Sequence, residues 1–145
     1  MRLPIQVEGI VFRKAGRQME YLMLKTIPER GDHWQPVTGG VEEGETNVEA
    51  LRREVWEETG VKNVVRIIEN VGYFEYSDVH FVKGFDFIKE HVFGVEVGSK
   101  ERIVIDGKEH SHFRWCSFQE ALKLLKWNEN KKALLKLNDI LKSER

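Results

Sequence analysis

The stretch from Gly39 to Gly60 constrains the fold of this chain more than any other segment. It predicts a helix over residues 46–59, because Thr46 is a favourable N-cap and Gly60 supplies the left-handed backbone that commonly ends a helix. Within this helix, Glu54, Glu57 and Glu58 are spaced i, i+3 and i+4, so they share one face. Three neighbouring carboxylates repel one another, and a hard divalent cation such as Mg²⁺, which takes oxygen ligands, is the natural partner.

The same helix has an apolar stripe formed by Val48, Leu51 and Val55, which lie within about 60° of one another around the axis. The three carboxylates span an arc of about 100° beside this stripe rather than opposite it. Carboxylates at the edge of a packed face have restricted rotamers, as a preorganised metal site requires. The pattern therefore favours a metal site over a solvated acidic face.

The residues around the helix start add two expectations. Gly39, Gly40 and Gly44 permit close backbone approach, and loop amides there could contact an anion. Arg53 could neutralise part of the acidic cluster, with Glu57 one turn on, or anchor the loop that enters the helix.

This region resembles a complete Nudix box, with the pattern Gly39-x₅-Glu45-x₇-Arg53-Glu54-Val55-x-Glu57-Glu58-x-Gly60-Val61. The resemblance implies the α/β (α+β) Nudix fold, in which a mixed β-sheet is sandwiched between α-helices. It also implies hydrolysis of a nucleoside diphosphate linked to another moiety, with Mg²⁺ or Mn²⁺ as cofactor. By the same resemblance, Glu54, Glu57 and Glu58 would bind metal, and one of them would also orient or deprotonate the water. Glu45 would assist at the metal site, and Arg53 would hold the cluster in place.

Apolar segments rich in Val, Ile, Phe and Tyr predict the remaining elements. Strands are expected at residues 7–13, 21–26, 34–38, 64–76, 79–89, 91–97, 103–105 and 112–116. Helices are expected at 118–125, opened by a capping box from Ser117 to Glu120, and at 128–142. We see no repeat or linker composition and expect residues 1–145 to form a single domain.

Composition narrows the class of protein. The 145 residues are 41% apolar and 32% charged, as is ordinary for a globular domain. The net charge of −1 gives no broad basic field, so nucleic acid is not an expected partner. No apolar run is long enough for a signal peptide or membrane span, and the lone Cys116 excludes an internal disulfide. We expect a cytoplasmic protein, monomer or homodimer, without membrane contact.

Residues 33–46, the pair Glu109-His110, Trp115 and Trp127 resemble one branch of the Nudix family. That branch includes dihydroneopterin triphosphate pyrophosphatase, also described as a dATP pyrophosphohydrolase. The resemblance implies a small-molecule substrate, either a (deoxy)nucleoside triphosphate such as dATP or dihydroneopterin triphosphate, cleaved to the monophosphate and pyrophosphate. Dinucleoside polyphosphate hydrolases of the Ap4A type share much of the pattern and remain the alternative.

Two further functions are less favoured by the sequence. A catalytically silent nucleotide-binding module would be expected to lose box carboxylates, whereas all four are present here. RNA binding or decapping should require a basic channel, which the near-neutral charge does not indicate.

Several side chains outside the helix are candidates for the site. Glu109 precedes the 112–116 strand and is a second candidate catalytic base, with Glu101 the weaker alternative. Trp34, Gln35, Gly39 and Gly40 are candidates for substrate binding, and Lys25 could contact a phosphate.

Aromatic and histidine side chains complete the candidate list. Trp34, Phe74, Tyr76 and Phe81 could form a stacking wall for a purine or pterin, although each also suits the core of a sheet. His110 and His112 could line the cleft, but neither has matching ligand partners in the sequence, so neither is predicted to be a metal ligand.

Overall fold

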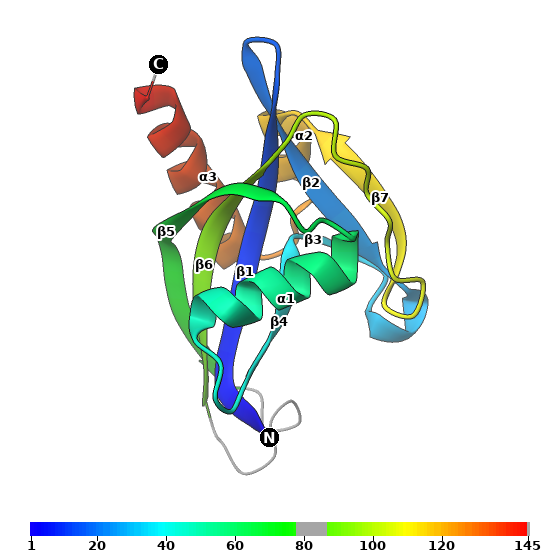
Figure 1. Cartoon of the computed structure of the whole chain (residues 1–145), viewed down its shortest axis with the longest axis vertical. Coiled ribbons are helices and arrows are strands. Elements are labelled where there is room, and N and C mark those ends of the chain that lie inside the picture. The colour runs from blue at the N-terminus through cyan, green and yellow to red at the C-terminus, as the bar shows by residue number, and fades with distance from the viewer. Residues whose placement is uncertain (78–86, 145) are drawn as a thin grey trace.

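The computed structural model describes residues 1–77 and 87–144. In these ranges a mixed sheet of seven strands carries helix α1 on one face and α2 and α3 on the other (Figure 1). The strand order is β3-β2-β1-β6-β5, with β4 also paired to β1 and β7 to β2. The strands are β1 (Arg2–Ala15), β2 (Gln18–Thr26), β3 (Trp34–Gln35), β4 (Val37–Glu42), β5 (Val64–Ser77), β6 (Phe87–Val97) and β7 (His110–Cys116). The helices are η1 (Pro28–Arg30, 3₁₀), α1 (Asn47–Thr59), α2 (Phe118–Leu124) and α3 (Asn128–Ser143).

Strand β1 divides the interior into two hydrophobic clusters. Its side chains alternate between the two faces of the sheet. Val7 and Val11 pack in the cluster under α1, whereas Ile10 and Phe12 pack in the cluster under α2 and α3. β1 is antiparallel to β2 and β4 and parallel to β6. This central strand therefore links the α1 face, where the acidic residues lie, to the opposite face.

Local sequence signals fix the helices as predicted. Thr46 and Ser117 both form capping boxes, and Gly60 ends α1 with a φ of 79°. α1 ends where expected, and α2 and α3 each differ from the predicted ranges by one residue at the C-terminal end. No helix among residues 1–77 and 87–144 is both long and apolar enough to cross a membrane.

The strand predictions need four corrections. The single strand predicted at 34–38 is two strands, β3 and β4, divided at Pro36, which has no N–H to donate. Gly39 and Gly40 lie inside β4, paired with β1, and not in a loop. Residues 103–105 form no regular strand. The predicted strands 79–89 and 91–97 meet in one continuous β6 from Phe87, and residues 79–86 lie outside the described ranges.

The break predicted at residue 90 is absent because Glu90 belongs to a pair of buried carboxyl groups inside the sheet. Glu8 of β1 is 0% exposed and Glu90 of β6 is 4% exposed. Burial raises the pKa of Glu90 to about 7, and burial followed by the charge of Glu90 raises the pKa of Glu8 well above its ordinary value. Asn130 of α3 donates a hydrogen bond to Glu8. A glutamate in a strand usually marks exposure or a break, but here it belongs to an internal polar pair.

Candidate active site

The three glutamates of the α1 acidic face differ in burial. Glu58 is 2% exposed, while the side chains of Glu54 and Glu57 are 12% and 45% exposed. Glu54 packs against Gly39 of β4 so closely that a Cβ at this position would lie 2.0 Å from Glu54 Cδ. The packing of α1 on the sheet therefore buries Glu58, partly buries Glu54 and leaves Glu57 accessible.

Arg53 joins most of the acidic residues into one network. Its Nε and Nη2 donate to the two carboxylate oxygens of Glu45 at 2.8 and 3.0 Å. Its Nη1 donates to Glu54 at 2.8 Å and to Glu57 at 3.3 Å, and Nη2 also donates to the carbonyl oxygen of Gly40 at 2.9 Å. Both contacts expected of Arg53, with Glu57 and with the segment before the helix, are present. The hydrogen bonds from Arg53 hold the pKa of Glu45 below its ordinary value.

Burial disfavours the charged form of both Glu58 and Glu54. Burial, and then the neighbouring carboxylate of Glu54, raises the pKa of Glu58 well above its ordinary value. Burial also raises the pKa of Glu54, against the opposing effect of Arg53. Neither carboxylate oxygen of Glu58 has a hydrogen-bond partner among the described residues. Because buried polar atoms are nearly always paired, these oxygens fit a divalent cation with oxygen ligands.

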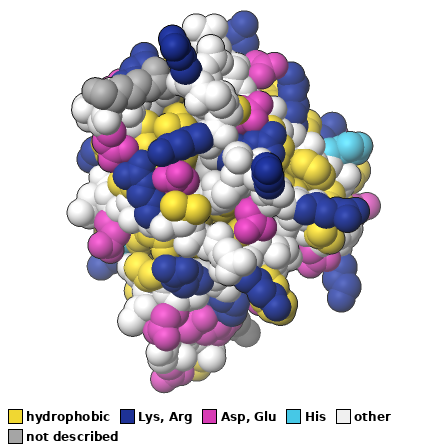
Figure 2. Space-filling view, turned by 45° about the horizontal axis from the view of Figure 1, so that its top comes forward, with side chains coloured by type: hydrophobic (Ala, Val, Ile, Leu, Met, Phe, Trp, Pro, Cys, Tyr) yellow, Lys and Arg dark blue, Asp and Glu magenta, His cyan; other side chains and the backbone are white. Residues whose placement is uncertain are grey.

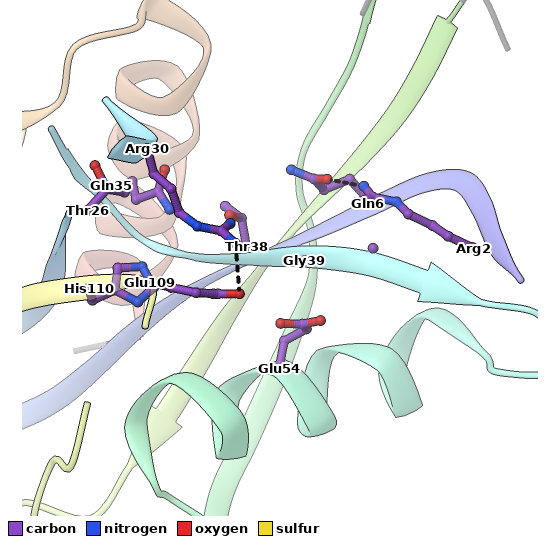
Figure 3. A pocket seen from close by; sticks show the side chains of 11 residues that line it. Arg2, Gln6, Thr26, Arg30, Gln35, Thr38, Gly39, Glu54, Glu109 and His110 are labelled. Carbon is purple, nitrogen blue, oxygen red and sulfur yellow. Dashed lines mark hydrogen bonds and ion pairs between the residues drawn. The ribbon is translucent and has the colours of Figure 1, made fainter. Parts of the chain in front are cut away.

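A cleft of about 160 Å³ opens around the edge of β4 (Figure 3). Figure 3 shows Glu54 on the α1 side of this strand, with Arg2, Gln6 and Arg30 on the other side. The described residues that line it are Arg2, Gln6, Thr26, Arg30, Gln35, Thr38, Gly39, Gly40, Glu54, Glu109 and His110. The cleft thus combines acidic and basic side chains.

The segment that leads into β7 contributes Glu109 and His110 to this cleft. Oε1 of Glu109 lies 3.8 Å from Nη2 of Arg30. His110 is 2% exposed, and its Nε2 lies 3.7 Å from Oε1 of Glu58. Burial, and then the positive charge of Arg30, lowers the pKa of His110, so its imidazole is neutral at pH 7. One ligand atom from each of Glu58, Glu109 and His110 lies within 4.8 Å of the other two, a group that could hold a metal ion.

The residues predicted to bind substrate fall into two groups. Gln35, Gly39 and Gly40 line the cleft. Trp34 does not, because alternation along β3 turns it to the opposite face from Gln35, where it packs against the cluster under α2 and α3. Lys25 is paired with Trp34 across the strands, and its Nζ lies 3.6 Å from Asp32. The structure therefore does not bring Trp34 or Lys25 into the cleft.

The predicted aromatic wall is likewise absent from the described part of the cleft. Phe74 and Tyr76 lie side by side in β5 with ring centroids 5.9 Å apart, and Phe74 packs against the α3 face. Phe81 lies outside the described residues. No Phe, Tyr or Trp side chain is among the described residues that line the cleft.

Some lining residues could not have been found from the sequence alone. Gln6 and Thr38 reach the cleft through the pairing of β1 with β4, which sets Gln6 opposite Gly40. Arg2 comes from the same end of β1, and Arg30 from the short helix η1. His110 could be found from the sequence, because the Glu109-His110 pair belongs to the family resemblance and Glu109 is itself a candidate.

Replacing Gly39 with alanine should disturb the site more than the fold. The new Cβ would meet the flexible end of Glu54, so the carboxylate should move while the backbone stays in place. We expect Mg²⁺ affinity to fall about 10- to 100-fold, as when ligand orientation is lost, with stability changed by less than about 1 kcal/mol. Calorimetric titration and thermal unfolding measure the two effects.

Gly107→Ala, where a Cβ meets nothing within 4 Å, is the control. Unchanged Mg²⁺ affinity in Gly39→Ala would contradict this placement of Glu54.

The chain belongs to the NUDIX family, because the model described as the NUDIX domain matches residues 3–137. The dihydroneopterin triphosphate diphosphatase of Haemophilus influenzae is 32% identical over 135 residues, covering 88% of this chain and 82% of that protein. The octanoyltransferase of Myxococcus xanthus is 30% identical over 115 residues, 79% of this chain and 31% of that protein. An RNA pyrophosphohydrolase of Bartonella henselae is 36% identical over 86 residues, 59% of this chain and 40% of that protein. The chain thus spans less than half the length of the last two relatives.

Solved structures confirm the predicted fold. A Listeria monocytogenes protein assigned to the NUDIX hydrolases superposes with a TM-score of 0.87 at 30% identity, covering 98% of this chain and 97% of that one. The Ap4A hydrolase of C. elegans superposes with a TM-score of 0.77 at 21% identity, covering 96% and 98%. The mixed sheet between helices is therefore the Nudix fold.

Proposed function

We propose that this protein is a Mg²⁺-dependent pyrophosphohydrolase. Its substrate would be a (deoxy)nucleoside triphosphate such as dATP, or dihydroneopterin triphosphate, cleaved to the monophosphate and pyrophosphate. The observation that carries this proposal is a cleft that contains Arg2 and Arg30 together with the partly buried Glu54, with the buried Glu58 beside His110 of the same cleft. Carboxylates suit a divalent cation and arginines suit phosphate oxygens, so together they suit a metal–phosphate complex.

Each residue of the network has a role in this proposal. Glu54, Glu57 and Glu58 would hold the metal. Arg53 would keep Glu54 and Glu57 in place through the hydrogen bonds described above. Glu45 would act indirectly, because both of its carboxylate oxygens accept hydrogen bonds from Arg53.

The chemistry follows from the charges in the cleft. A bound divalent ion would offset phosphate charge and lower the pKa of a water molecule. Arg2 and Arg30 would neutralise further phosphate oxygens and orient the polyphosphate. Glu109 enters the cleft near these arginines and could accept a proton from the attacking water, as could a box carboxylate.

The size of the cleft supports a phosphate site more than a base site. Its volume of about 160 Å³ is well below the 300–1,000 Å³ typical of pockets that enclose a drug-sized ligand. The described cleft would therefore hold the polyphosphate, and the base or pterin would extend beyond it. The likeness to the Haemophilus influenzae dihydroneopterin triphosphate diphosphatase supports a triphosphate of this kind.

A dinucleoside polyphosphate hydrolase is the alternative. A small cleft leaves room outside for a second nucleoside, and the fold is also that of the C. elegans Ap4A hydrolase. An RNA substrate is supported by relatives that this chain matches only in part. Figure 2 shows Lys and Arg side chains interspersed with acidic and hydrophobic ones on the face in view, rather than gathered into one basic field. A silent binding module is disfavoured, because all four box glutamates are retained.

Product analysis tests the proposal. The protein would be incubated with Mg²⁺ and a panel of dATP, other nucleoside triphosphates, dihydroneopterin triphosphate, diadenosine tetraphosphate and 5′-triphosphorylated RNA. We expect pyrophosphate and a monophosphate from a triphosphate, with the rate reduced at least about 100-fold in Glu57→Gln. Glu69→Gln, an exposed change in β5, is the matched control and should keep the full rate.

Other products would redirect the assignment. Cleavage of diadenosine tetraphosphate alone, to two nucleotides, would move the protein to the alternative. Pyrophosphate released only from RNA would assign it to RNA processing. Absence of turnover on the whole panel would contradict the proposal and favour a binding module.

A further inference from the structure

His110 is a buried side chain without a hydrogen-bond partner in the described part of the chain. It is 2% exposed, and neither Nδ1 nor Nε2 has a hydrogen-bond partner there. A neutral imidazole carries one donor and one acceptor, and leaving both unpaired inside a protein is unfavourable. The unpaired ring therefore points to a ligand.

Two carboxylates lie beside this ring. Oε1 of Glu58 lies 3.7 Å from Nε2 of His110, which is beyond the usual hydrogen-bond range of about 3.2 Å. Both oxygens of Glu58 are themselves buried and unpartnered among the described residues. Glu109 completes the group, in which the three ligand atoms lie within 4.8 Å of one another.

The distances between these ligand atoms fit a shared metal ion better than a direct hydrogen bond between the side chains. Two donors that are each about 2.1 Å from one ion lie roughly 3.0 to 4.2 Å apart, depending on the coordination angle. The Glu58–His110 distance falls inside this range, and the whole group is only slightly wider. A small movement of Glu109 would close the site.

We propose that Glu58, Glu109 and His110 form a mixed nitrogen–oxygen site for a first-row transition-metal ion such as Fe²⁺. Mg²⁺ favours oxygen ligands, whereas imidazole suits Fe²⁺, Zn²⁺, Ni²⁺ and Cu²⁺, so His110 sets the metal preference at this position. The inference rests on the proposed function through Glu58, which also belongs to the α1 acidic face, and through Glu109, which would hold the ion here instead of accepting the proton of the water.

Arg30 offers a second, opposite test of the metal site. Its Nη2 lies 3.8 Å from Oε1 of Glu109, and its side chain is 59% exposed. The guanidinium therefore competes with a cation for Glu109 and can swing away into solvent. Removing its charge should strengthen the site, whereas removing His110 should weaken it.

The test uses Mn²⁺ as the probe, with the full chain in excess Mg²⁺. Calorimetric titration measures the affinity, and pulsed EPR detects coupling between bound Mn²⁺ and a ¹⁴N nucleus. We expect one Mn²⁺ with ¹⁴N coupling in the wild type. We expect loss of the coupling and at least about tenfold weaker binding in His110→Gln, and tighter binding in Arg30→Met.

The outcomes separate this inference from the proposed function. Mn²⁺ bound without ¹⁴N coupling in the wild type would overturn it, even if His110→Gln failed to fold, and so would unchanged affinity in a folded His110→Gln. Mg²⁺-dependent triphosphate cleavage together with either result would leave the proposed function intact. Coupled Mn²⁺ binding without turnover of any substrate would support the site and contradict only the function.

Discussion

Replacing Glu58 with glutamine is expected to lower kcat about 10³-fold and, at the same time, to stabilise the metal-free protein. The buried carboxylate has no hydrogen-bond partner among the described residues, and it lies beside Glu54. Glutamine keeps the shape, removes the charge and can donate to the carboxylate of Glu54. We expect a gain of about 1–3 kcal/mol in EDTA at pH 8, the cost of an unpaired buried polar group. The loss of rate reflects the removal of a metal ligand or base.

Thermal unfolding in EDTA and in Mg²⁺, together with initial rates, measures both effects. Mg²⁺ should raise the Tm of the wild type more than that of the variant, because ligand binding stabilises only the folded state. Glu43→Gln, an exposed change before α1, should alter neither rate nor Tm. A Glu58→Gln variant less stable than the wild type in EDTA would show that the native carboxylate is compensated.

The second large effect is a fall in stability with rising pH, which originates at Glu8 and its neighbour Glu90. The carboxyl group of Glu90 is 4% exposed, and burial raises its pKa to about 7 from an ordinary value of 4.5. Between these two pH values the unfolded chain releases the Glu90 proton while the folded chain keeps it. The free energy of unfolding therefore falls as the pH rises. The stabilisation is present below about pH 4.5 and is lost as the pH rises to about 7.

Glu90→Gln should flatten this part of the pH profile. Urea unfolding at pH 5, 6, 7 and 8 gives the free energy of unfolding of the wild type and the variant. We expect the difference between them to grow in favour of the variant with increasing pH. Glu69→Gln should follow the wild type. Parallel profiles for wild type and Glu90→Gln would mean that Glu90 does not contribute to the pH dependence.

The parts of the fold that were predictable depend on neighbours in sequence. The α1 boundaries follow from Thr46 and Gly60, whose capping roles require only residues within one turn. The acidic face follows from the same helical spacing. Contacts of Arg53 with Glu57 were also predictable, since one turn separates the two residues.

The parts that were not predictable depend on pairing between distant segments. Gln6 joins the cleft because β1 pairs with β4, and no local pattern reports that pairing. Gly39 and Gly40 have low strand propensity, so a strand through them is unexpected until Glu54 and Arg2 are seen to need the space. The polar neighbour of Trp34 suggests exposure and a substrate contact, but the face of the sheet on which its side chain lies depends on the register of β3 with β2.

The parallel pairing of β1 with β6 has a consequence for the assembly of the chain. Ile5 pairs with Lys89 and Phe12 with Glu96, so every partner on this ladder is 84 residues away. Bringing such distant segments together costs loop-closure entropy before any hydrogen bond forms. Topologies dominated by such contacts are typical of domains that fold in milliseconds to seconds rather than microseconds. Strand β1, which contributes to both hydrophobic clusters, is thus stabilised by β6, and β6 can reach β1 only when the chain closes a long loop.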